Sequence, residues 1–358
     1  MALYSNTLQV LRHYLSGAVG DLIYGQCGTT GATTTKTYAP FLWQASDYYN
    51  EMKFEVYVYA GTNIGLTRRV TDWDLTTFLL TVHSAYAAAC DATSYVELHH
   101  KFSEDDYRKA INLAIESART NYVVPLIDET TVKLASTTDN LSNIVYTYEY
   151  SLPSTMTHLY RVVKEKATAG IKLTGTVSAG TWTAGETVTQ GTATGEFAYD
   201  GSTYIRLRKV SGTFTTTGGT ATGGTSSETV SSITAVASEP AGMGVWYDSD
   251  EIDTRNWSIV KTYPSGTASL SLNQSYIGSL DEDLYLRLEG HMRQGTLTAD
   301  TGVCYLPLDW IVQKAITYLP LDKIQSNQLE RTYAMAEVWA RTHEPRNNPN
   351  PRARKVME

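Results

Sequence analysis

The chain has 358 residues and a formal net charge of −8, which argues against a general nucleic-acid binder, because such proteins need a basic surface to displace counterions from phosphate. Charged residues make up 18% of the chain, against about 25% in an average soluble domain. Threonine and tyrosine, with 50 and 25 copies, take their place. Since both favour strands, the composition predicts a β-rich protein with broad polar but uncharged faces.

Cysteine usage and hydropathy exclude further classes. The three cysteines, Cys27, Cys90 and Cys304, are odd in number and far apart, so the sequence predicts neither a disulfide framework nor a zinc cluster. No apolar run reaches the roughly 20 residues that span a bilayer, and the first residues lack the pattern of a signal peptide. We therefore expect no membrane partner and an aqueous, reducing compartment or a particle assembled there.

The first expected elements are a short helix and a set of strands. Ser5 or Asn6 can cap the helix, and Gly17 and Gly20 end it. Its apolar stripe comprises Leu8, Leu11, Tyr14, Leu15 and Ala18. A Gly- and Thr-rich loop follows at 25–36, and alternating apolar and polar residues predict strands at 51–60, 66–70, 76–82 and 94–98.

The clearest helix is predicted over 103–122. Ser103 is a natural N-cap, Asp106 completes a capping box, and Pro125 closes the segment. Strands are expected next at 144–152 and 159–164.

Residues 168–240 differ in composition from the rest of the chain. The segment 177–186 (VSAGTWTAGE) is echoed 33 residues later by 210–219 (VSGTFTTTGG), and each copy carries one aromatic residue, Trp182 or Phe214. We interpret the stretch as two similar β units stacked as one inserted domain. A disordered Thr/Gly linker is the alternative, and the alternation of apolar residues favours folding.

Strands are expected again at 257–263, 268–272 and 283–289, followed by helices at 309–319 and 327–343. The last segment, 344–358, has three prolines and no periodicity, which is typical of an extended arm.

Together these elements predict an α+β fold. A helical bundle would combine 1–24, 101–135 and 305–343, with a β block at 37–100. A β-sandwich-like layer would combine 141–167 and 241–300, and the small all-β module at 168–240 would be inserted into it. Residues 344–358 would form a C-terminal arm.

Catalytic motifs are missing from the sequence. It has no phosphate-binding loop, no GxGxxG, no GxSxG and no HExxH, so we expect no enzyme, no cofactor and no metal. His99 and His100 are adjacent on an expected strand and would point to opposite faces. The run 281–283 is best interpreted as a solvated turn, and Cys27 as a bystander thiol.

Two groups of residues are candidates for contacts with other molecules. Trp43, Tyr48 and Tyr49 cluster in one segment, where an interface or core edge is the first interpretation and a sugar-binding platform the second. Four cations, Arg346, Arg352, Arg354 and Lys355, lie on the C-terminal arm of an otherwise acidic chain. They indicate either a solvated terminus or an arm that docks in an acidic groove.

Several stretches resemble head-to-tail adaptor (connector) proteins of tailed bacteriophages. The helix DYRKAINLAIESA (106–118), followed by YEYSLPSTMTHLYRV (148–162), is similar to the helix, the strand ending in Leu-Pro and the Leu-x-Arg-Val strand of those proteins. The runs 257–272 and 284–319 are similar to the continuation, with a Leu-Arg-Leu strand and a Leu-Pro entry into helices.

This resemblance implies a homo-oligomeric ring, commonly of twelve copies, in the virion neck, between capsid and tail. The ring would be assembled in the host cytoplasm, dock on the portal protein through the basic arm, and contact a downstream tail or neck protein. DNA would pass through it without sequence-specific binding. Two alternatives stay open: a virion adhesin or tail-associated glycan-binding module, and a glycan-degrading enzyme whose carboxylates the sequence does not pair.

Overall fold

The computed structural model describes residues 5–119, 121–138, 144–261, 268–273 and 283–345. The chain divides into two compact units. The first comprises residues 1–124 and 293–350, and the second comprises 125–292 and 351–358.

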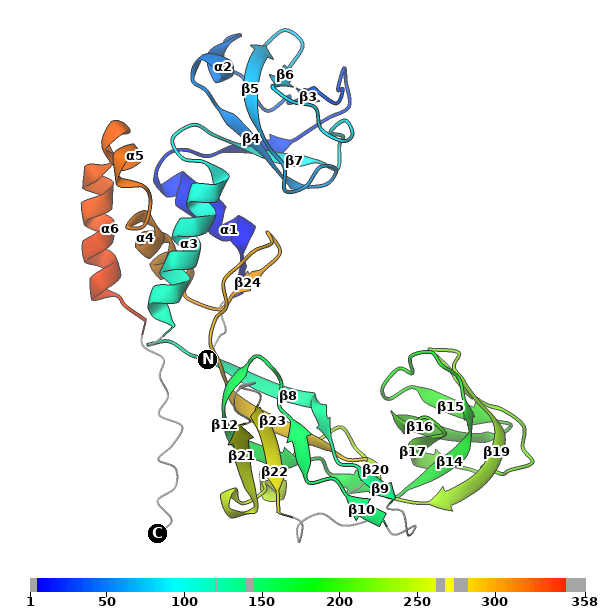
Figure 1. Ribbon diagram of the computed structural model, residues 1–358. Helices are drawn as coiled ribbons and strands as arrows, with labels where there is room; N and C mark the ends of the chain where they lie inside the picture. Colours follow the sequence, from blue (N-terminus) through cyan, green and yellow to red (C-terminus); the bar gives the residue numbers. More distant parts are fainter. Residues whose placement is uncertain (1–4, 120, 139–143, 262–267, 274–282, 346–358) are drawn as a thin grey trace. The chain divides into compact units, whose positions relative to one another are not determined.

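A curled six-stranded sheet forms one part of the first unit (Figure 1). The strand order is β2-β7-β4-β5-β6-β3, with antiparallel neighbours. The bounds are β2 Ile23–Gln26, β3 Lys36–Tyr38, β4 Glu55–Ala60, β5 Thr67–Asp74, β6 Leu79–Val82 and β7 Tyr95–His99, with the short helix α2 at Tyr48–Glu51. Phe54, Val56 and Val58 point into the core, as their alternation predicted, and pack with the fully buried Trp73. We call this sheet the half-barrel.

Helices make up the rest of the first unit (Figure 1). Their bounds are α1 Leu8–Ala18, α3 Glu104–Ala118, α4 Leu308–Ile316, α5 Leu321–Ser326 and α6 Glu330–Thr342. Contacts join α1, α3 and α4 to one another, and α6 packs on α4. The capping box of Ser103 and Asp106 is confirmed. Thr7 caps α1 instead of Ser5 or Asn6, because β1 (Asn6–Thr7) pairs with β24 (Val303–Cys304).

Small antiparallel sheets form the body of the second unit. One is β12-β23-β8 and another is β11-β22-β21, while β9 pairs with β10 and β13 with β20. The bounds are β8 Val124–Lys133, β9 Ser136–Thr138, β10 Ile144–Tyr146, β11 Glu149–Ser151, β12 Met156–Lys164, β13 Ala167–Thr168, β20 Ala241–Gly242, β21 Trp257–Lys261, β22 Ala268–Leu272 and β23 Tyr285–Met292, with 3-10 turns at Asp248–Asp250 and Thr254–Asn256.

A closed six-stranded barrel completes the second unit (Figure 1). Its bounds are β14 Gly170–Val177, β15 Thr187–Gln190, β16 Ala193–Asp200, β17 Tyr204–Ser211, β18 Ala221–Gly223 and β19 Thr229–Ser238. The strand order is β14-β17-β16-β15-β18-β19, closed by the pairing of β14 with β19. The stretch 168–240 is therefore folded and is not a disordered linker.

The internal repeat explains this strand order. If β14, β15 and β16 exchange places with β17, β18 and β19, respectively, each pair of neighbouring strands becomes another neighbouring pair of the same barrel. The strand order thus has a pseudo-twofold symmetry that relates the two copies. Trp182 and Phe214, one from each copy, lie in a single core. There the ring of Trp182 stacks on that of Phe197, with the ring centroids 5.1 Å apart. The two copies thus share one barrel instead of stacking as two separate units.

The predicted α+β class is wrong, because the chain is mostly β, with 39% strand and 20% helix. The segment 101–135, which was assigned to the helical bundle, is helical only from Glu104 to Ala118, and β8 follows from Val124. The expected sandwich-like layer is a group of small sheets, each of which pairs strands distant in sequence, such as β12 with β23 and β11 with β22. Local patterns located many of these strands but not their partners, which depend on long-range contacts.

Candidate assembly surface

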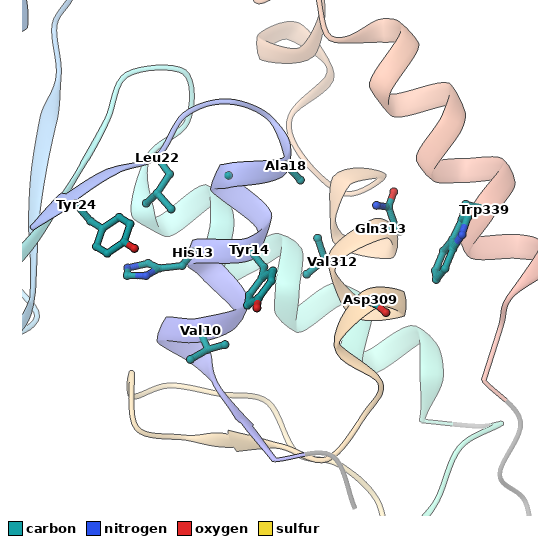
Figure 2. Close-up of a pocket in the computed structure, with 11 residues that line it drawn as sticks. Val10, His13, Tyr14, Ala18, Leu22, Tyr24, Asp309, Val312, Gln313 and Trp339 are labelled. Atoms are coloured by element: carbon teal, nitrogen blue, oxygen red, sulfur yellow. The ribbon is translucent and has the colours of Figure 1, made fainter.

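An open groove with a volume of about 710 Å³ lies between α1, α4 and α6 (Figure 2). Tyr14 of α1, Val312 of α4 and Trp339 of α6 line it, together with Tyr24 of β2. Its polar groups include Asp309, Gln313 and His13. This mixture of aromatic and aliphatic walls with a few polar groups is typical of a surface that binds another protein segment.

The outer face of α6 exposes two apolar side chains, whereas the larger Tyr333 and Trp339 of the same helix are partly buried. The side chains of Met335 and Val338 are 64% and 59% exposed, whereas the smaller Ala336 and Ala340 are buried. The Trp310 indole N–H donates a hydrogen bond of 2.9 Å to the Ala340 carbonyl, which fixes the alanine side against α4. A helix that packs only on its own chain buries its larger apolar side chains. Met335 and Val338 therefore form an exposed apolar surface on α6, which we call its outer face.

Sequence reasoning missed this face, although a signal was present. In the sequence, Tyr333, Ala336, Trp339 and Ala340 recur at helical spacing as one apolar stripe, which contains both buried alanines. Met335 and Val338 are three residues apart and lie off that stripe, so they form a second apolar stripe on the same helix. This second apolar stripe is the signal in the sequence that could have located the exposed face.

A buried charge cluster includes His13, one of the residues that line the groove. The guanidinium group of Arg12 is fully buried, and it contacts Glu97 of β7 and Asp300, the latter at 2.6 Å. The Tyr57 hydroxyl donates a hydrogen bond of 2.8 Å to Asp300. His13, which lines the groove, places its Nε2 atom 2.7 Å from a carboxylate oxygen of Glu97. The cluster thus joins α1 to the half-barrel and to the segment that precedes β24.

Asp21, which follows the C-terminal end of α1, is a second buried carboxylate that joins elements distant in the sequence. Asp21 accepts backbone hydrogen bonds of 2.9, 3.0 and 3.1 Å from His100, Lys101 and Phe102, and one of 2.7 Å from the Tyr107 hydroxyl. Burial alone would raise the pKa of Asp21, but the His100 side chain at 2.9 Å and the backbone N–H groups of His100 and Lys101 lower it. They fix the connection between β7 and α3.

The pKa values in the cluster follow from its contacts. Burial alone would raise the pKa of Glu97, but the close approach of His13 and His99 and the charge of Arg12 lower it to about 2. Burial alone would lower the pKa of His99, but the neighbouring Glu97 and Asp21 carboxylates raise it. The folded state therefore favours the charged forms of Glu97 and His99, because each charge stabilises the other.

We expect the first unit to lose stability in acid. Because the folded-state pKa of Glu97 lies below its unfolded value of 4.5, its contribution is complete above pH 4.5 and disappears as the pH falls to about 2, by on the order of 3 kcal/mol. The raised pKa of His99 has the opposite sign, so its contribution is complete below 6.5 and disappears at higher pH. Scanning calorimetry from pH 2 to 8 should show greatest stability between these values. In Glu97→Gln the melting temperature should fall less steeply between pH 4.5 and pH 2 than in the unmodified protein. An equally steep fall would contradict this assignment.

The sequence-predicted site residues are placed as follows. Trp43 is 75% exposed, whereas Tyr49 is only 1% exposed and packs on Trp73 and Phe54. Tyr48 is half-buried beside Tyr49. The three rings therefore do not share one exposed face.

The basic residues of the arm, Arg346, Arg352, Arg354 and Lys355, lie outside the described residues. Among the described residues, no group of three or more His, Cys, Asp and Glu side chains could hold a metal ion. No helix in the described part of the chain is long and apolar enough to cross a membrane.

No protein-family model matches the chain, and neither does any curated protein or solved structure.

Proposed function

We propose that this chain is a structural subunit of a tailed-bacteriophage neck. It forms a ring that acts as a head-to-tail adaptor, docks on the portal protein, joins it to a downstream tail protein and surrounds a channel for DNA. The subunit works without catalysis, in the virion between capsid and tail, after assembly in the host cytoplasm. The proposal starts from the resemblance of residues 106–162 and 257–319 to such adaptors.

The single observation that carries the ring is the outer face of α6. We assign it to a second copy of the chain, because the charges on this helix are balanced, with Glu330 and Glu337 set against Arg331 and Arg341. The chain as a whole carries −8, so copies repel one another elsewhere and approach most easily at an apolar face of balanced charge. The adjacent groove offers an acceptor for side chains of the neighbouring copy.

The overall charge also suits a DNA channel. An acidic surface with many uncharged polar residues repels phosphate, so DNA can slide past it without being held.

Native mass spectrometry of the purified protein, alone and with the portal protein, tests the proposal. We expect a closed oligomer that binds the portal. A monomer that ignores the portal at micromolar concentration contradicts the adaptor function. If that monomer binds polysaccharide through the exposed Trp43, the glycan-binding alternative replaces it.

The basic arm supplies a prediction of its own. Truncation after Pro345 removes Arg346, Arg352, Arg354 and Lys355 but keeps the hydrogen bond of 2.8 Å from Asn121 to Glu344. We expect an unchanged melting temperature and at least a tenfold loss of portal affinity, measured by titration at low salt, because four cations are lost from the contact. Full-length protein in which the four cations are replaced by glutamine should behave like the truncation. Undiminished binding of both proteins would contradict the docking role.

A further inference from the structure

The groove between α1, α4 and α6 is left open by its own chain. Figure 2 shows Tyr14 of α1 and Trp339 of α6 on its two sides, with Val312 of α4 between them. The rings of Tyr14 and Tyr24 are each 56% exposed. Asp309 of α4 is also exposed, and no ion pair among the described residues includes it. The groove therefore combines exposed aromatic rings with one negative charge that has no partner in this part of the chain.

The outer face of α6 continues into a positive charge. Arg331, Met335 and Val338 follow one another at steps of four and three residues, so they lie along one line of the helix. Arg331 is exposed, and the ion pairs of the described residues do not include it. A helix that docks in an apolar groove presents its anchoring side chains at this spacing. The line thus offers two apolar anchors and one available cation.

The line on α6 and the groove match in chemistry. The apolar anchors suit the aromatic and aliphatic walls, and the Arg331 guanidinium group suits the Asp309 carboxylate. The volume of about 710 Å³ lies within the range of about 300–1,000 Å³ that is typical of binding sites. The line cannot enter the groove of its own copy, because α6 itself forms one wall of that groove through Trp339. The occupant that the match selects is therefore α6 of a second copy.

We propose that the outer face of α6 in one copy docks in the groove of the next copy, with Arg331 beside Asp309. The two surfaces differ, and every copy presents one of each, so the contact runs head to tail from copy to copy around the ring. This inference rests on the proposed ring and adds to it the surface that receives α6.

A mixture of two variants tests the contact. Met335→Glu combined with Val338→Glu removes the outer face but keeps the groove, and Tyr14→Glu places a charge in the groove but keeps the outer face. All three positions are exposed, so the melting temperature of each variant should change little. Each variant alone should be monomeric in native mass spectrometry. An equimolar mixture should form a 1:1 dimer that grows no further, because only one intact outer face meets one intact groove.

Exchanging the two charges tests the orientation of the contact. Asp309→Arg alone, or Arg331→Asp alone, sets like charges against each other, and each should weaken assembly at least about tenfold. The two changes together restore an opposite pair and should recover most of the lost assembly. Arg341→Asp changes a cation that lines another hollow of the same helix, and it should not rescue Asp309→Arg. Equal rescue by Arg341→Asp, or no rescue by Arg331→Asp, would refute the pairing.

The outcomes separate this contact from the ring itself. If the unmodified protein is monomeric at every concentration, the ring and the contact both fail. If it forms a closed oligomer but the mixture stays monomeric at about tenfold the concentration needed for that assembly, only the contact is overturned. Full assembly of Tyr14→Glu alone would overturn the contact as well.

Discussion

Replacing Arg12 with methionine is expected to destabilise the first unit by about 3–5 kcal/mol, enough to unfold much of it at 37 °C. Methionine keeps most of the volume of the apolar stem, so the loss comes from the charge. Without the guanidinium group, the carboxylates of Glu97 and Asp300 stay buried beside each other and lose their common partner. Chemical denaturation followed by tryptophan fluorescence and circular dichroism measures the change.

Two further variants show whether burial of the charge causes this effect. Arg108→Met removes a partly exposed arginine that pairs with Asp105 at 2.9 Å on the surface of α3, and it should cost less than about 1 kcal/mol. Combining Arg12→Met with Glu97→Gln should recover part of the lost stability, because one unpaired charge disappears. Equal effects of Arg12→Met and Arg108→Met would refute the importance of the buried cluster.

Features that depend on neighbouring residues could be predicted from the sequence. The capping box of Ser103 and Asp106 was predicted because both partners lie within one helical turn. The alternation of Phe54, Val56 and Val58 likewise identified a buried row at β4. In the predicted stripe of α1 the three leucines are buried, but Tyr14 and Ala18 are exposed. Such patterns express the geometry of a single element, which a short stretch of sequence contains completely.

Contacts between distant residues could not be predicted in this way. Arg12 and Asp300 are 288 positions apart and Arg12 and Glu97 are 85 apart. As isolated residues, all three would be expected on the surface.

The fold class was wrong for a related reason. The repeat in 168–240 was visible, but its copies exchange strands, so neither copy is a closed unit by itself. A repeat pattern shows that two segments are similar and does not show whether they stack or interleave. In the remaining β segments, the pairing of the strands determines whether they form a sandwich or small separate sheets. Strand pairing is not visible in the periodicity of a single strand's sequence.

The outer face of α6 gives the second large expected effect. Replacing both Met335 and Val338 with glutamate places two charges on the proposed contact between copies and buries them without partners if the ring forms. We expect the protein to change from a closed oligomer to a monomer in native mass spectrometry and analytical ultracentrifugation. The melting temperature of the monomeric unit should change little, because both side chains are already exposed in the single subunit.

The buried side of the same helix provides the matched control. Ala336→Glu places one charge against α4, where Ala336 is 1% exposed, and should unfold α6 instead of only separating the copies. Glu337→Gln, at an exposed position between the two faces, should leave the stability unchanged, because an exposed charge contributes little to it. If the Met335 and Val338 double variant still forms the full oligomer, another surface holds the ring together. If the double variant is monomeric and keeps its stability, the buried face of α6 stabilises the subunit and the outer face joins one subunit to the next.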